Sequence, residues 1–207
     1  MFSYKIIKIF VIISFIILGI LGFILFQRVS MQDEQSFDIK AIIGLGNPGP
    51  KYVLNRHNIG FLILDQLADR YNASWETKLN MELATVRIKD KNILLIKPQT
   101  FMNESGKVIP FLQKKGIKAE HILVVHDELE FPFGKIKIRQ GGSARGHNGL
   151  RSIIEYCGKE FARLRFGIGR PPLKEMVSQH VLSNFTESNQ ELEGAMYQAV
   201  DMIEEIL

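Results

Sequence analysis

The sequence predicts an α/β protein: a single compact domain with a mixed, mostly parallel twisted sheet flanked by helices, preceded by an N-terminal hydrophobic helix. Two observations predict this fold class. From residue 39 onward, short β-branched apolar runs alternate with longer stretches whose apolar residues recur at helical spacing. Before residue 39, the chain contains a long uncharged apolar segment. We therefore divide the 207 residues into a hydrophobic extension (1–30), a polar linker (31–38) and one domain (39–207).

The extension contains eighteen consecutive residues without a charge, 9–26. A helix of that length matches a bilayer core of about 30 Å, so a membrane anchor is one interpretation. Lys5 and Lys8 precede the segment while only Arg28 follows closely, which places the amino terminus inside and the remaining chain outside. A buried core helix would need a polar outer face, and a signal peptide would need a cleavage site of small residues. The segment has neither.

The first half of the domain has the pattern of a strand, a helix and a hairpin. Ile39–Leu45 is a β-branched apolar run that ends in a loop of glycine and proline, and Ile59–Tyr71 has apolar residues at helical spacing. Glu82–Lys89 and Ile93–Lys97 flank Asp90-Lys91-Asn92, which predicts a β-hairpin.

The second half alternates helices with strands. A helix is predicted over Ser105–Lys115, with Pro110 as a source of irregularity. Ile122–Val125 is a short apolar strand that runs into the polar residues 126–128. The remaining predicted elements are the strands Lys135–Arg139 and Arg163–Ile168, the helix Asn148–Cys157, which ends at Gly158, and the amphipathic helix Glu191–Leu207.

Several classes of chemistry are excluded by the motifs that the chain lacks. Cys157 is the single cysteine, so an internal disulfide framework and a CxxC site are excluded. No G-x-S-x-G motif presents a serine nucleophile, and the histidines lack the spacing of metal ligands, so we expect no metal. Gly44–Gly49 matches G-x-G-x-x-G, but Pro48 and Pro50 remove backbone donors that a pyrophosphate would need. We therefore expect no nucleotide cofactor.

Positive charge is concentrated in one part of the chain. Residues 134–170 hold nine lysines and arginines against two acids, whereas residues 171–207 hold one lysine against seven acids. The basic stretch covers predicted strands, a glycine-rich loop and a helix start, which suits contacts to phosphate groups, so a nucleic acid is one candidate partner. The alternative is a charged face that only contacts water.

A histidine and an aspartate are the best candidates for catalysis. His57 lies in a polar loop just before a helix, and Asp127 lies just past a buried strand, where α/β folds place their sites. A carboxylate there can hold an imidazole in one tautomer and favour its cation, so that the histidine acts as a base on water. Asn47, Asn103 and Asn148 occur in turns or at helix starts, where they either cap the backbone or bind an ester or peptide group.

Together, five segments resemble the bacterial peptidyl-tRNA hydrolase family. They are IIGLGNPGPKYVLNRHNIGF (42–61), KPQTFMNESG (97–106), VVHDELEFPFGKIKIRQGG (124–142), GHNGLRSI (146–153) and RLRFGIGRP (163–171). The resemblance covers residues 39–207. It implies a compact, monomeric α/β enzyme that needs no metal and cleaves the ester between a peptide and tRNA, which recycles tRNA from stalled or aborted translation.

The resemblance also implies roles for single residues. His57 matches the catalytic base, Asp127 the acid that orients it, and Asn47 a catalytic-site residue that helps to distinguish a blocked peptide amine from a free one. Arg139 and Arg165 match a basic pair that receives a tRNA phosphate. The other residues at positions that contact the peptidyl or tRNA end are Tyr52, Phe101, Met102, Asn103 (the favoured donor to the oxyanion) and Asn148.

Three features depart from the pattern of the family. Arg145 stands where relatives often have a small residue, the chain ends at Leu207 where relatives commonly run further, and the hydrophobic extension is foreign to the family. A cytoplasmic tRNA substrate conflicts with an anchor that exports the domain. We therefore favour a cytoplasmic protein translated from Met31, with an inner-membrane tether through 9–26 as the alternative. The alternative function is a non-catalytic RNA-binding protein on the same scaffold.

Overall fold

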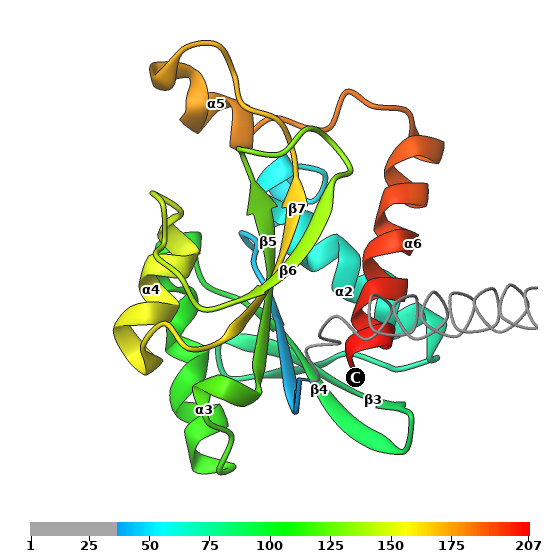
Figure 1. The fold of residues 1–207 in the computed structure, drawn as a ribbon. Helices are drawn as coiled ribbons and strands as arrows, with labels where there is room; N and C mark the ends of the chain where they lie inside the picture. The colour runs from blue at the N-terminus through cyan, green and yellow to red at the C-terminus, as the bar shows by residue number, and fades with distance from the viewer. Residues whose placement is uncertain (1–36) are drawn as a thin grey trace, which may run out of the picture. The chain divides into compact units, whose positions relative to one another are not determined.

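A seven-stranded mixed sheet forms the centre of the structure, a computed structural model that describes residues 37–207 (Figure 1). The strand order across the sheet is β2-β3-β4-β1-β5-β7-β6. The strands are β1 (Ala41–Gly44), β2 (Glu76–Lys78), β3 (Met81–Ile88), β4 (Lys91–Pro98), β5 (Ile122–Glu128), β6 (Ile136–Gln140) and β7 (Ala162–Gly167). The hydrophobic helix predicted at 9–26 lies outside the described residues. None of the helices within 37–207 has the length and apolar character needed to cross a membrane.

Parallel pairing is confined to the middle of the sheet. β1 pairs in parallel with β4 and β5, and β5 pairs in parallel with β7. At the edges, β2, β3 and β4 form an antiparallel meander, and β6 pairs with β7 in the antiparallel sense. The predicted mixed sheet is confirmed, although three of its six pairings are parallel rather than most of them.

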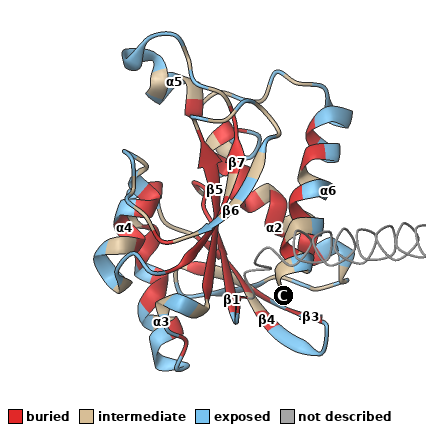
Figure 2. Ribbon diagram, viewed as in Figure 1, coloured by how far each residue is buried: buried red, intermediate tan, exposed pale blue. Residues whose placement is uncertain are grey.

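Helices cover both faces of the sheet, with α2 and α6 on one face and α3 and α4 on the other (Figure 1). Because successive side chains of a strand point to opposite faces, β1 supplies Ile42 to the core on the α2 and α6 side and Ile43 to the core on the α3 and α4 side. Figure 2 shows the buried residues concentrated on the strands and on the inner sides of these helices. The α-helices are α2 (Ile59–Arg70), α3 (Ile109–Lys114), α4 (Asn148–Cys157), α5 (Val177–Val181) and α6 (Asn189–Ile206), and the 3-10 helices are η1 (Pro50–Tyr52), η2 (Arg56–Asn58), η3 (Met102–Val108), η4 (Ala119–His121) and η5 (Lys174–Met176).

The predicted elements are present within a few residues of their expected bounds, with one helix as the exception. The helix predicted over 105–115 is wrong in its first half, because η3 occupies 102–108 and α3 begins only at Ile109. Pro110 stands in the first turn of α3, where a missing N–H has no helical partner to lose. Sequence analysis missed the short helix α5 and also β2, whose three residues are polar and exposed.

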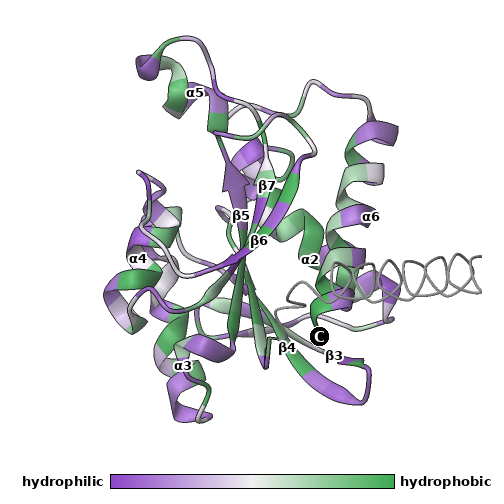
Figure 3. Ribbon diagram, in the orientation of Figure 1, coloured by the Kyte–Doolittle hydropathy of each residue, from purple (hydrophilic) through white to green (hydrophobic). Residues whose placement is uncertain are grey.

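The carboxyl ends of β1 and β5 lie next to each other because the two strands are parallel neighbours. β5 continues to Glu128, so Asp127 lies within the strand end and not past it as predicted. Figure 3 shows β5 changing from hydrophobic to hydrophilic toward this end. At the start of α2, Gly60 approaches β1 so closely that an added Cβ would lie 2.3 Å from the backbone nitrogen of Leu45. The loop that precedes α2 therefore reaches the carboxyl ends of β1 and β5.

Candidate active site

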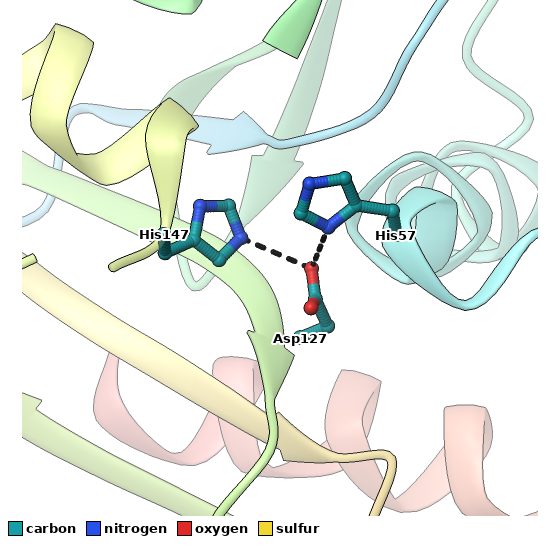
Figure 4. A group of neighbouring side chains, drawn as sticks. All are labelled: His57, Asp127 and His147. Atoms are coloured by element: carbon teal, nitrogen blue, oxygen red, sulfur yellow. Dashed lines mark hydrogen bonds and ion pairs between the residues drawn. The ribbon is translucent and has the colours of Figure 1, made fainter. Parts of the chain in front are cut away.

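One carboxylate oxygen lies between two imidazoles at the carboxyl ends of the central strands. Oδ1 of Asp127 is 2.7 Å from Nδ1 of His57 and 3.0 Å from Nε2 of His147 (Figure 4). His57 belongs to η2, and His147 is the residue that caps the amino end of α4. The fold thus joins the predicted pair, and it adds a second histidine that was not predicted.

The hydrogen bonds determine which nitrogens carry protons. Nδ1 of His147 accepts the backbone N–H groups of Gly149 (3.2 Å) and Leu150 (3.4 Å), so the proton of the neutral ring is on Nε2 and is donated to Asp127. An ionised carboxylate only accepts, so Nδ1 of His57 must also be the donor. Nε2 of a neutral His57 is then unprotonated, and Figure 4 shows it turned away from Asp127.

Charge and burial act on this cluster in opposite directions. Burial raises the pKa of Asp127, but the charges of His57 and His147 and their hydrogen bonds outweigh it and hold that pKa well below its usual range. Burial lowers the pKa of His57, but the charge and hydrogen bond of Asp127 outweigh it, so the pKa of His57 is raised above 6.5. Asp127 therefore stays ionised at neutral pH and favours the His57 imidazolium.

Three hydrogen bonds to two other residues hold Asn47, which distinguishes it from an ordinary turn residue. Its backbone N–H donates to Oδ1 of Asn58 (2.9 Å), and its backbone carbonyl accepts from Nδ2 of Asn58 (2.9 Å). Its side-chain oxygen accepts the backbone N–H of Met102 (2.8 Å). The amide nitrogen of Asn47 is the remaining donor. These bonds join the loop after β1 to η2 and η3, so the three loops form one wall.

A cavity of about 870 Å³ opens beside this cluster, and all ten predicted site residues line it. Within it, Phe101, Asn103 and Asn148 are exposed, while Asn47, Met102 and Asp127 are buried. Asn148 is the first residue of α4 and does not cap it, since His147 does. The complete predicted set is Asn47, Tyr52, His57, Phe101, Met102, Asn103, Asp127, Arg139, Asn148 and Arg165.

The two predicted phosphate-binding arginines differ in their surroundings. Arg139 on β6 is exposed and, within 37–207, takes part in no ion pair. Arg165 on β7 donates from Nε and Nη2 to Oε2 of Glu128 (2.8 and 2.7 Å) and stacks over Phe131, with 4.4 Å from its guanidinium carbon to the ring centre. This pairing was not predicted. Arg145, the expected departure in the loop before α4, also lines the cavity and has a positive φ of 46°.

His147 is the clearest residue that sequence analysis missed. The local spacing of the histidines does not predict a contact between His147 and Asp127, which are 20 residues apart. The available signal was its position directly before Asn148 at a predicted helix start. A third histidine, His126, lies edge-on to His147 with 5.2 Å between ring centres. Its burial lowers its pKa to about 3, so it is neutral.

The cluster of His57, Asp127 and His147 also has the composition of a metal site, since its ligand atoms lie within 4.8 Å of one another. A zinc ion would stand about 2.0–2.2 Å from each ligand atom and keep the ligands apart from one another. Here both imidazoles contact the same carboxylate oxygen at 2.7 and 3.0 Å, which are hydrogen-bond lengths. The geometry therefore fits a hydrogen-bonded cluster better than a metal centre.

Comparisons with known proteins identify the family of the chain. The family model described as peptidyl-tRNA hydrolase matches residues 41–207. The chain belongs to the peptidyl-tRNA hydrolase family. A peptidyl-tRNA hydrolase of Bartonella henselae is 45% identical over 161 residues, which cover 77% of this chain and 83% of the relative. That of Enterococcus faecalis is 44% identical over 167 residues, which cover 79% of this chain and 89% of the relative.

Solved structures give the same family. The crystal structure of a peptidyl-tRNA hydrolase in complex with N-propanol has a TM-score of 0.77 and 38% identity, and the match covers 84% of this chain and 91% of that one. The peptidyl-tRNA hydrolase of Acinetobacter baumannii has a TM-score of 0.73 and 40% identity, with coverages of 82% and 86%. The resemblance stated from the sequence motifs and the predicted α/β class are confirmed.

Proposed function

We propose that this member of the peptidyl-tRNA hydrolase family cleaves the ester between a peptide and tRNA, with His57 as the general base that activates water. One observation carries the mechanism: Nδ1 of His57 is bonded to Asp127, so Nε2 is left unprotonated and turned away from that bond. The names of the relatives supply the substrate class.

The attacking nucleophile is water, because an ester has a good leaving group and needs no covalent intermediate. His57 accepts the proton of the water at Nε2 while the oxygen attacks the ester carbonyl, and a general base of this kind contributes about 10²–10⁴-fold to the rate. Asp127 holds the ring and stabilises the imidazolium that forms. The ribose hydroxyl then leaves with a proton from the imidazolium.

Amide groups on the walls of the cavity receive the substrate. Asn103 is exposed in the cavity and carries a side-chain N–H that can donate to the developing oxyanion. The side-chain oxygen of Asn47 accepts the backbone N–H of Met102, so its amide nitrogen can donate to a carbonyl of the substrate, which suits the blocked amine end of a peptide. Phe101, Tyr52 and Asn148 would contact the peptidyl or tRNA end.

The basic side of the cavity would hold the nucleic acid. Arg139 and Arg165 sit on neighbouring strands, and residue 139 pairs with residue 163, two positions before Arg165. We propose that they receive a tRNA phosphate. We also propose a domain that spans 39–207, a cytoplasmic monomer translated from Met31, and hydrolysis without a metal or nucleotide cofactor.

Release of N-acyl-amino acid from N-acyl-aminoacyl-tRNA tests the proposal. Hydrolysis that persists with a chelator present is the expected result. Tight binding of the same tRNA without ester cleavage would favour the non-catalytic RNA-binding protein instead, and loss of activity with the chelator that zinc restores would favour a metal centre at His57, Asp127 and His147.

A further inference from the structure

A buried arginine that the mechanism does not use lines the cavity. Arg163 is 3% exposed and is the second residue of β7, where it pairs with Val124 of β5 and Arg139 of β6. Among residues 37–207, no carboxylate pairs with it. Burial, with the charges of Arg139 and Arg165, lowers the pKa of Arg163 to about 10, which leaves the guanidinium protonated at neutral pH.

The guanidinium is directed at the backbone of one loop. Nη1 of Arg163 donates to the carbonyl of Ser143 at 2.7 Å, and Nη2 donates to the carbonyl of Gly142. The ring of Phe161 supports the guanidinium at 4.7 Å. A planar fork can span two successive carbonyls, whereas a lysine ammonium is a single point of charge. The Arg163 guanidinium thus binds backbone carbonyls and forms no ion pair with the carboxylates of residues 37–207.

The loop that Arg163 holds leads directly to the catalytic cluster. Residues 141–147 connect β6 to α4, and Gly141, Gly142, Arg145 and Gly146 all have positive φ. Such a loop has many alternative conformations when it is not tied down. It ends at His147, whose Nε2 lies 3.0 Å from Oδ1 of Asp127.

The opposite side of the same loop faces a predicted phosphate contact. An added Cβ at Gly142 would lie 2.8 Å from Nη2 of Arg139, so the Arg139 guanidinium rests against this glycine. Arg163 therefore holds the turn whose far end positions His147, while Arg139 contacts the turn from the exposed side.

We propose that Arg163 is a positioning residue for the hydrolysis: by binding the carbonyls of Gly142 and Ser143, it holds the loop that places His147 on Asp127. This inference rests on the proposed function of the cluster. It differs from the phosphate role of Arg139 and Arg165, because it acts on the catalytic step with any substrate, including one that lacks the tRNA body.

The test compares Arg163→Lys, which keeps the charge and loses the fork, with wild type and with the control Arg87→Lys on the exposed face of β3. Two readouts are needed: kcat on full N-acyl-aminoacyl-tRNA and on a minimal N-acyl-aminoacyl ester, and the NMR signal of the Nε2 proton of His147. The second readout requires no activity, so it separates failure of this inference from failure of the proposed function.

We expect Arg163→Lys to keep its fold by thermal unfolding, to lose about tenfold in kcat on both substrates, and to lose or broaden the His147 signal. Arg87→Lys should match wild type. An Arg163→Lys protein with wild-type kcat and an intact His147 signal would overturn the inference, as would a rise in KM confined to the full substrate, which would make Arg163 a phosphate contact.

If Arg163→Lys does not fold, Gly142→Ala carries the test, because a Cβ at φ 108° strains the turn whose carbonyls Arg163 binds while Arg163 itself is unchanged. Loss of kcat on the minimal ester and of the His147 signal supports the inference, and wild-type values for both refute it.

Discussion

At the scale of single residues, His57 and Asp127 set each other's protonation state. The buried carboxylate is ionised because two imidazoles bond to it, and the same bond raises the pKa of His57 above 6.5. His57, the proposed base, works in its unprotonated form, so its raised pKa lowers activity at low pH. In return, the imidazolium that forms in the transition state is stabilised. The pH profile of the enzyme should show this balance.

We expect kcat/KM of the wild type to rise with pH through an apparent pKa above 6.5, which belongs to His57 in the free enzyme. In Asp127→Asn the raising influence is removed while burial remains, so this limb should move to lower pH. The plateau should also fall by about 10²–10⁴-fold, since the ring loses its orientation and its counter-charge. The pH dependence of initial rates measures both effects. A limb that does not move in Asp127→Asn would assign the titration to another group.

At the scale of elements, the site depends on how closely two segments of backbone approach. The start of α2 packs against the end of β1 with no side chain between them, because Gly44 and Gly60 face each other. A Cβ added to Gly44 would lie only 2.4 Å from the carbonyl oxygen of Gly60. This contact carries the loop with His57 to the end of β5. Gly44 and Gly60, which belong to different elements, therefore permit the same close contact.

Gly60→Ala should destabilise the protein by about 1–3 kcal/mol or more, because its Cβ would meet backbone atoms that cannot rotate away. Gly194→Ala in α6 is the matched control. An added Cβ there meets nothing within 4 Å, and it should stabilise the helix by about 0.5–1 kcal/mol. Denaturant unfolding measures both changes. Equal stability of the two variants would show that the approach of α2 to β1 is not required.

Because Arg165 pairs with Glu128, we expect its loss to affect tRNA binding more than the loss of Arg139. Arg165→Ala should raise KM for full tRNA substrates about tenfold, because it removes a cation and leaves the buried Glu128 carboxylate unpaired beside the phosphate. Arg139→Ala should raise KM only about threefold, as for an exposed ion pair. In both variants kcat should change little.

The double variant Glu128→Gln with Arg165→Ala is the control for this explanation. Its KM should return toward that of Arg139→Ala, because the unpaired charge is gone. If the double variant is as weak as Arg165→Ala, the carboxylate does not repel the substrate and the loss is due to Arg165 alone. Steady-state kinetics on full and minimal substrates separate these cases.

At the scale of the whole molecule, local pattern predicted most of the fold and two of the three residues of the cluster. Ile42, Ile43 and their neighbours have a strand pattern that any sheet would bury, and His57 and Asp127 flank apolar elements where sites are expected. β2 could not be predicted, because its polar residues become a strand only by pairing with β3. His147 and the Arg165–Glu128 pair depend on where a loop and two long side chains settle, which spacing in the sequence does not determine.

Every site residue named above lies within 37–207. A chain that begins at Met31 should therefore hydrolyse N-acyl-aminoacyl-tRNA with the same kcat/KM as the 207-residue chain, within about twofold. Kinetics on the two purified proteins test this. A large loss in the shorter chain would show that the extension contributes to substrate binding or to stability.

We propose above all that His57 activates water for ester cleavage in a cavity that binds tRNA independently of this step. Single-turnover hydrolysis of N-acyl-aminoacyl-tRNA by wild type and His57→Ala, with tRNA affinity measured in parallel, tests it most directly. We expect the rate constant of His57→Ala to fall by at least about 100-fold while the Kd for tRNA stays within about threefold. A rate constant within about tenfold of wild type would contradict the claim.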